Sequence, residues 1–150
     1  MANPYWADGA SRPVLQQLAD QLGVHDKIVF TGRVPRNAAL SYLLASDVCV
    51  LPHLKTPLTD MGLPHKLTQY FAAGKPVVST PLDPVVRMFR KAVYFWQPTT
   101  AEKLSEILRD LYSDSGLRQS LAGTGQSLVR EKYNWEIEKR RLLGVYESIA

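Results

Sequence analysis

The stretch from Gly62 to Thr80, GLPHKLTQYFAAGKPVVST, holds the residues that most suggest chemistry with phosphate. Its Gly74-Lys75 pair is typical of a phosphate-binding P-loop. A P-loop, however, needs a strand, then G-x-x-x-x-G-K-[S/T], then a helix. Here Gly74 follows a helical pattern, and Pro76 stands where the magnesium-binding Ser or Thr should be. We therefore interpret Gly74 as the left-handed residue that ends the helix and Pro76 as the residue that prevents its continuation.

The other end of this helical pattern is a stronger candidate for a binding site. Gly62, Leu63 and Pro64 precede Lys66 and follow the loop at the carboxyl end of an expected strand. Ligands of open parallel sheets sit at that edge, and a helix N-terminus there offers unpaired N–H groups and a positive dipole end to phosphate oxygens. A plain helix start with a solvated Lys66 would have the same sequence, so both interpretations stay open.

Other residues with chemical potential have simpler explanations. His53, Asp60 and His65 are close in sequence but lie on an irregular loop, so we predict no metal site. Cys49 stands among apolar residues and is interpreted as a small buried side chain. The G-x-G in AGTGQS (122–127) lacks a preceding strand, and we interpret it as a helix interruption. We assign no catalytic residue.

Length and composition indicate a soluble globular chain. It has 150 residues, of which 45% are apolar and 21% charged, which is ordinary for one domain with one core. We therefore predict a single domain over residues 1–150. No apolar run reaches the length of a membrane span, and the N-terminus lacks the pattern of a signal peptide. We expect a cytoplasmic location.

The net charge of +4 raises the question of an anionic partner. The basic residues are scattered, and the densest cluster, Lys139, Arg140 and Arg141, lies in a helical pattern beside Glu136 and Glu138. We interpret this cluster as a solvated helix face and predict no nucleic-acid partner. A weak contact with a membrane surface is the competing interpretation, and strong salt dependence of binding would favour it or a nucleic-acid partner.

The elements that must position these residues follow from apolar periodicity. Short apolar runs predict buried strands over 27–30, 47–52, 76–80 and 92–96. Residues at helical spacing predict helices over 11–23, 37–46, 64–74, 83–89, 100–113, 115–131 and 134–149.

This alternation of strand and helix, with strands that are apolar throughout, predicts an α/β fold. It corresponds to a parallel, Rossmann-like sheet with helices on both faces. Four strands are few for such a sheet, although PYWAD (4–8) offers a further short one. We therefore interpret the chain as the C-terminal part of a larger α/β domain.

Several blocks together resemble a known family. LGVHDKIVFTGRVP, ASDVCVLP, LPHKLTQYFAAGKPVVST and the closing YNW…VYESI follow one another as in the second domain of family-four glycosyltransferases of the GT-B fold. The match in order and spacing runs over about residues 14–149. The resemblance implies a C-terminal half-domain that binds a nucleotide sugar and takes part in retaining transfer of the sugar to an acceptor hydroxyl.

The resemblance also implies roles for particular residues. Gly32, Arg33 and Val34 would lie against the base of the donor. The amides around Gly62, Leu63 and Pro64 would hold the diphosphate, with Lys66 at the position of the family's Lys. Such enzymes usually need no cofactor or metal, because the donor is a substrate and protein charges neutralise the leaving phosphate.

The chain departs from the family pattern in two ways. Gln69 stands where the family has a Glu that accepts hydrogen bonds from the ribose, and Met61 replaces another Glu near the transferred sugar. A Gln accepts as a neutral and weaker partner. Judged by the family pattern, we also expect these 150 residues to lack the first strands of the donor domain and the N-terminal acceptor domain. The isolated chain is therefore expected to be an incomplete enzyme that needs that domain or a partner chain. The alternative is a non-catalytic remnant or interaction module on the same scaffold.

Overall fold

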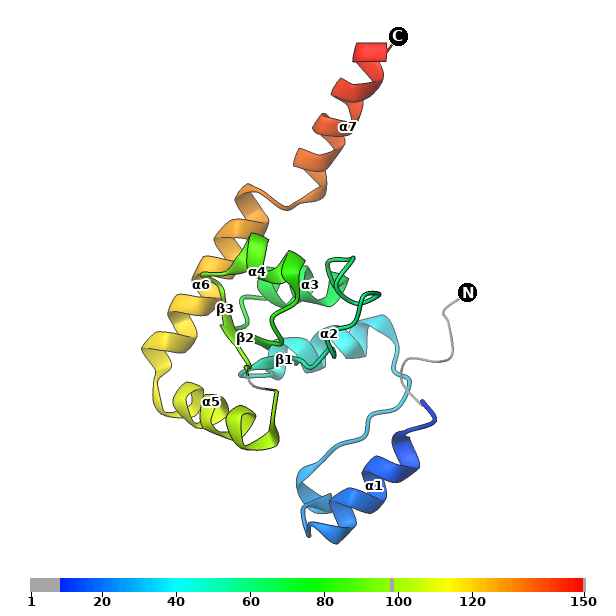
Figure 1. Ribbon diagram of the computed structural model, residues 1–150, viewed down its shortest axis with the longest axis vertical. Coiled ribbons are helices and arrows are strands. Elements are labelled where there is room, and N and C mark those ends of the chain that lie inside the picture. Colours follow the sequence, from blue (N-terminus) through cyan, green and yellow to red (C-terminus); the bar gives the residue numbers. More distant parts are fainter. Residues whose placement is uncertain (1–8, 98, 150) are drawn as a thin grey trace. The chain divides into compact units, whose positions relative to one another are not determined.

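The computed structural model describes residues 9–97 and 99–149, and these fall into two compact units. One unit extends to Tyr42 and the other begins at Leu43 (Figure 1). Helix α2 (Arg36–Ala45) contains the boundary between them in the sequence. The single domain predicted over 1–150 stays a prediction.

The first unit is built on helix α1 (Arg12–Gln21), as its apolar spacing predicts. Gly23 ends the helix with φ of 65°, in the left-handed region that glycine adopts most easily. The amide of Val24 donates to the carbonyl of Ala19 at 3.0 Å, and that of Gly23 donates to Asp20 at 3.0 Å. These two bonds satisfy the last carbonyls of the helix in a Schellman motif.

The strand predicted over 27–30 is wrong. Residues His25–Lys27 form a 3₁₀ turn, η1, and the chain is then extended at Ile28 (φ −118°, ψ 127°). Within the described residues no strand pairs with this segment. An extended segment becomes a strand only when a neighbouring segment pairs with it through ladder hydrogen bonds. The apolar sequence of residues 27–30 does not show whether such a neighbour exists.

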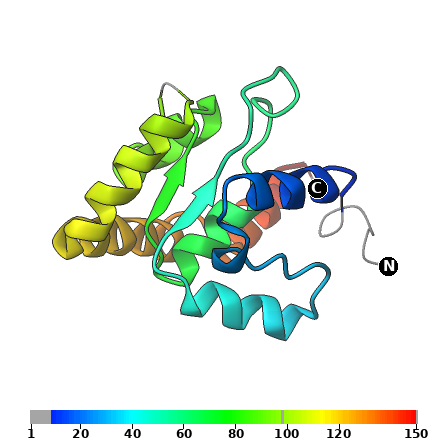
Figure 2. The ribbon, with the colours of Figure 1, turned by 90° about the horizontal axis from the view of Figure 1, so that it is seen from below.

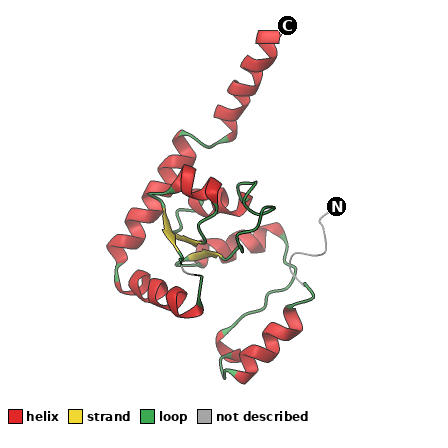
Figure 3. Ribbon diagram, in the orientation of Figure 1, coloured by secondary structure: helices red, strands yellow, loops and turns green. Residues whose placement is uncertain are grey.

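The second unit contains a three-stranded parallel sheet, shown in yellow in Figure 3. The strands are β1 (Cys49–Leu51), β2 (Val77–Ser79) and β3 (Val93–Phe95), in that spatial order. The register places Cys49 beside Val77 and Val77 beside Val93. The α/β class and the three remaining predicted strands are confirmed, each strand being shorter than its apolar run.

Helices cover both faces of this sheet, as strands that are apolar throughout require (Figures 1 and 2). Val77 and its register partner Val93 face one core, while Val78, the next residue of β2, faces the other. The first core is filled by α3 (His65–Ala72) and α4 (Asp83–Phe89), and the second by α5 (Ala101–Ser113). Helix α6 (Ser115–Glu131) contributes side chains to both cores.

Helix α6 runs without a break through the AGTGQS sequence, so the predicted interruption there is wrong. Gly125 is buried in the middle of the helix, where the ring of Phe71 in α3 lies against its backbone. The glycine therefore serves close packing between two helices. Helix α6 begins at a local cap, because the Asp114 carboxylate accepts from the amide of Leu117 at 2.8 Å.

The last helix, α7 (Trp135–Ile149), begins where Asn134 Oδ1 accepts from the amide of Ile137 at 3.1 Å. Large apolar side chains are exposed along it, including Leu142 and Tyr146. In the described part of the chain, no helix combines the length and the apolar character that a membrane crossing requires. The short strand considered at PYWAD (4–8) lies outside the described residues.

Candidate site at the carboxyl edge of the sheet

Two segments leave the same edge of the sheet because β1 and β2 are parallel. The segment after β1 leads to α3, and the segment after β2 leads to α4. Thr80 joins them: its amide donates to the carbonyl of Leu51 at 3.4 Å, and its hydroxyl donates to the carbonyl of His53 at 2.6 Å. Ser79 and Thr80 are buried, so their hydroxyls serve structure at this edge.

The entry to α3 is the open part of this edge. Pro64 precedes the first helical residue, His65, and no side chain of a described residue caps the helix there. A Cβ atom added at Gly62 would meet nothing within 4 Å. The backbone before α3 therefore has free space beside it, and the first amides of the helix are available to an anion.

Helix α3 turns its polar side chains away from the core. Leu67 and Phe71 are completely buried, whereas Lys66 and Gln69 are exposed. Residues three apart are neighbours on a helix surface, so the ammonium and the amide share one side of α3. The structure thus brings Lys66 and Gln69 together with the open segment that begins at Gly62.

The predicted base-binding residues Gly32, Arg33 and Val34 belong to the unit that ends at Tyr42. Gly32 has φ of 61°, which explains why glycine occupies the turn. The α3 segment belongs to the other unit.

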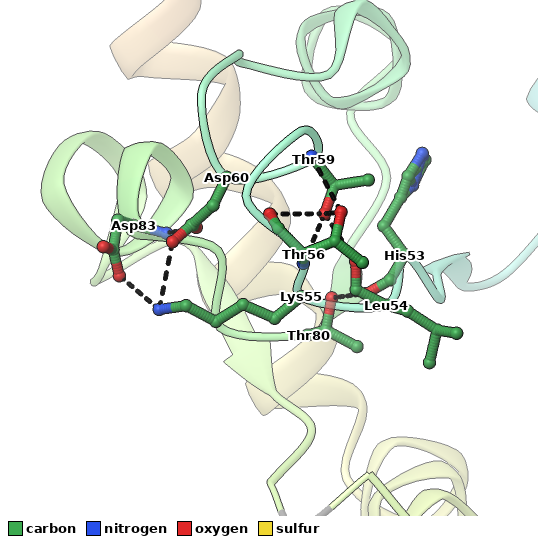
Figure 4. Close-up of polar contacts among 8 residues, drawn as sticks. All are labelled: His53, Leu54, Lys55, Thr56, Thr59, Asp60, Thr80 and Asp83. Atoms are coloured by element: carbon green, nitrogen blue, oxygen red, sulfur yellow. Dashed lines mark hydrogen bonds and ion pairs between the residues drawn. The ribbon is translucent and has the colours of Figure 1, made fainter.

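The charged residues of the loop between β1 and α3 form a cluster that the sequence did not predict (Figure 4). The ammonium of Lys55 lies 2.5 Å from Asp83 Oδ1 and 3.3 Å from Asp60 Oδ2. The other oxygen of Asp60 accepts from the backbone amide of Asp83 at 2.6 Å. Chiefly this backbone bond lowers the pKa of Asp60, and the bond to Asp83 chiefly raises the pKa of Lys55.

Only a weak sequence signal for this cluster exists. Asp83-Pro84 is a common helix start. The amide of Asp83, at the first position of that helix, therefore needs an acceptor from outside the helix. Nothing in the sequence shows that the acceptor is Asp60, 23 residues earlier. Among the described residues, no group of three acidic, His or Cys side chains could hold a metal ion. Asp60 is instead occupied by Lys55 and by the amide of Asp83.

Gly74-Lys75 has the structural role expected of a helix end. Gly74 has φ of 65°, its amide donates to Phe71 at 2.9 Å, and the amide of Lys75 donates to Tyr70 at 3.0 Å. This is again a Schellman motif. The ammonium of Lys75 donates to the carbonyl of Leu44 at 2.7 Å, near the end of α2. Neither residue faces the edge where α3 begins.

Comparison with known proteins identifies the family. Residues 8–127 match the family model of the glycosyl transferases group 1. The chain belongs to this family, as the sequence blocks predicted.

Two relatives illustrate the match in sequence. The chain is 28% identical over 141 residues to an uncharacterised glycosyltransferase of Methanocaldococcus jannaschii, covering 93% of this chain and 35% of the relative. It is 27% identical over 138 residues to the phosphatidyl-myo-inositol mannosyltransferase of Mycobacterium leprae, covering 90% and 36%. The chain therefore spans about a third of the length of these relatives.

Solved structures agree on the fold. A sucrose-phosphate synthase of Thermosynechococcus elongatus superposes with a TM-score of 0.81 at 21% identity, over 99% of this chain and 36% of that one. The C-terminal domain of a group 1 glycosyl transferase of Francisella tularensis gives a TM-score of 0.69 at 26% identity, over 83% and 63%. The predicted likeness to the C-terminal part of a GT-B glycosyltransferase is confirmed.

Proposed function

We propose that this chain is the donor-binding part of a glycosyltransferase that moves a sugar from a nucleotide sugar to an acceptor hydroxyl with retention of configuration. The observation that carries the proposal is the start of α3. It is exposed and has no side-chain cap, and open space lies beside Gly62. It also lies at the carboxyl edge of a parallel sheet, where ligands of such folds bind.

The groups at this edge suit a nucleoside diphosphate. The first amides of α3 and the positive end of the helix attract phosphate oxygens, and Lys66 adds a cation in the first turn. Gln69, one turn further on the same side, is placed to accept a hydrogen bond from the ribose. Gly32, Arg33 and Val34 are proposed to contact the base.

The transfer itself requires neutralisation of the diphosphate as it leaves the sugar. We assign this task to Lys66 and to the helix N-terminus, which stabilise the developing charge without reorganisation. The nucleotide sugar is the substrate, and the proposal includes no cofactor or metal. The acceptor is held by an N-terminal domain or a partner chain, and a cytoplasmic location belongs to the same proposal.

A substitution at Gly62 tests the site directly. Gly62 has open space around it and a negative or extended φ, so Gly62→Ala should leave stability almost unchanged. A bound diphosphate would fill that space, so the same variant should bind more weakly. The matched control is Gly144→Ala on α7, where an added Cβ also meets nothing within 4 Å.

The measurement is a thermal shift with UDP, GDP and ADP at millimolar concentration, followed by calorimetric titration. A ligand at a hundred times its dissociation constant stabilises the fold by about 2.7 kcal/mol. We expect at least one nucleotide to bind the unmodified chain and the Gly144→Ala variant alike, and Gly62→Ala more weakly. If a folded chain binds none of the three, the proposal is wrong.

The second candidate function is an interaction module without catalysis. It is favoured by a groove of about 250 Å³ in the first unit whose lining is apolar. The lining residues are Leu15, Leu18, Ala19, Leu22, Val24, Ile28 and Phe30. Association without any nucleotide binding would support this function over the first.

A further inference from the structure

The loop between β1 and α3 holds its conformation by polar contacts. Before Leu63, which packs against the core, its large apolar side chains are left in solvent: Leu54 is 73% exposed, Leu58 78% and Met61 80%. Burial of apolar surface, the main stabilising force elsewhere in the unit, therefore contributes little here. The conformation of the loop depends on the hydrogen bonds and ion pairs that fasten it.

The near end of the loop is fastened by threonines. Thr80 holds the carbonyl of His53. Within the loop, the hydroxyl of Thr59 donates to the carbonyl of Leu54 at 2.5 Å and accepts from the amide of Thr56 at 2.9 Å. These contacts close a compact turn, and the backbone amides of Asp60 and Met61 continue it by donating to the carbonyls of Thr56 and Leu58 at 2.9 and 3.4 Å. All of these bonds lie within the loop, so they do not tie it to α4.

The far end of the loop is fastened to α4 by the side chain of Asp60. Its carboxylate caps the amide of Asp83, the first residue of α4, whose N-cap residue Leu82 provides no side-chain cap. Asp60 thus satisfies a donor of another helix while it anchors its own loop. Its side chain is only 17% exposed, compared with 70% for Asp83.

Lys55 completes this anchor. Asp60 and Asp83 bring two carboxylates to the start of α4, and the ammonium of Lys55 lies between them (Figure 4). Without it the two negative charges would repel each other, and Asp60 would lose one of its two contacts. The three residues come from two segments of the chain, so the contact joins the loop to α4.

The anchor lies next to the segment assigned to phosphate. Gly62 is two residues after Asp60, and two residues span at most about 7 Å. On the other side, Leu67 is completely buried, and Pro64 has its φ fixed by its ring. Both ends of the segment from Met61 to Pro64 are therefore held, one by the core and one by Asp60.

We propose that Lys55 and Asp60 are positioning residues for the phosphate-binding segment, and that they act by fastening the loop to the start of α4 at Asp83. This inference rests on the proposed nucleotide site for its effect on binding. The anchor keeps the backbone at Gly62 in a fixed geometry before the nucleotide binds. Binding therefore does not include the entropic cost of ordering the loop.

Two variants remove the anchor in different ways. Lys55→Met removes the ammonium and keeps the length of the side chain, and Asp60→Ala removes both the ion pair and the cap. Lys55→Arg retains the charge and should restore the behaviour of the unmodified chain. The matched control is Lys103→Met on α5, which breaks an exposed ion pair with Glu106 (2.8 Å) outside the loop.

Hydrogen exchange followed by mass spectrometry reports on the loop without any ligand. We expect exchange of peptides covering residues 54–66 to speed up about threefold or more in Lys55→Met and Asp60→Ala, because local opening governs exchange. Lys55→Arg and Lys103→Met should leave it unchanged. Unchanged exchange in the first two variants would overturn the proposal.

Titration with UDP, GDP and ADP then tests positioning. Suppose that in Lys55→Met the segment from Met61 to Pro64 has its binding conformation for about one fifth of the time. The apparent affinity for the nucleotide then falls about fivefold. Faster exchange with unchanged affinity in both variants would overturn the positioning role. Failure of the unmodified chain to bind would overturn the proposed function and this role with it, whereas the exchange data would still show whether the three residues fasten the loop.

Discussion

The contact between Gly125 and Phe71 gives the sharpest test of how this unit is packed. A Cβ atom at Gly125 would lie 2.1 Å from Cδ1 of Phe71, far inside the roughly 3.5–4.0 Å at which carbon atoms pack. Phe71 has no room to retreat, because it is completely buried and its ring centroid lies 5.1 Å from that of Phe89. The ring of Phe89 packs in turn against Tyr133 at 4.9 Å.

Gly123 provides the internal reference for Gly125→Ala. It lies in the same helix, but an added Cβ there meets nothing within 4 Å. Alanine is favoured over glycine in a helix interior by about 1 kcal/mol, so Gly123→Ala should stabilise the fold by about that amount. Gly125→Ala gains the same propensity and loses about 1–3 kcal/mol to overpacking. The two variants should therefore differ by about 1–3 kcal/mol.

Urea unfolding of the two variants measures this difference. For a chain of this size, 1 kcal/mol corresponds to about 2–4 °C in Tm, so thermal unfolding should rank the variants in the same order. Phe71→Leu, which shortens the ring side chain, should relieve part of the cost of Gly125→Ala, so that the two changes are not additive. Equal stabilisation by both alanine substitutions would refute the packing argument.

Three further predictions concern Gln69, Asp60 and the apolar groove of the first unit. Gln69→Glu should bind a ribonucleotide about fivefold more tightly, because charged hydrogen bonds contribute about 1 kcal/mol more than neutral ones, and it should discriminate better against the 2′,3′-dideoxy analogue. Calorimetric titration that finds neither gain would remove Gln69 from the ribose site. Because the folded pKa of Asp60 lies below its ordinary 3.8, its contribution to stability is complete above that pH and is lost as the pH falls through the lowered value. In Asp60→Asn the free energy of unfolding should therefore fall less steeply as the pH is lowered below about 4. An unchanged dependence of the unfolding free energy on pH in this range would contradict the prediction. Finally, the apolar groove of the first unit should make the chain associate in sedimentation, less so in Leu18→Ser, and a monomer over a wide concentration range would count against it.

Local chemistry explains the parts of the fold that the sequence predicted well. Gly23 and Gly74 each end a helix because a left-handed residue is required within one turn of the last helical hydrogen bond. The apolar runs of β2 and β3 predict strands buried on both faces, and the structure places helices on both sides. The family itself was predicted from the resemblance of whole sequence blocks, and the family match over residues 8–127 confirms it.

Contacts between distant segments were decided only by the tertiary structure. The segment at Ile28 has the apolar sequence of a strand and remains unpaired among the described residues, because a strand is defined by its neighbour. Gly125 looked like an interruption of a helix, but the ring of Phe71, 54 residues earlier in the chain, explains it.

For the candidate site too, some features were predicted from the sequence and others came only from the tertiary structure. The sequence by itself predicted a helix over 64–74 that follows Gly62 and carries Lys66 in its first turn, since local torsional preference and helical period decide both. Only the tertiary structure showed that Asp60 caps α4 and that Lys55 joins Asp60 to Asp83. Such pairs arise when packing closes a long loop, and no local preference of the chain encodes which side chains then meet.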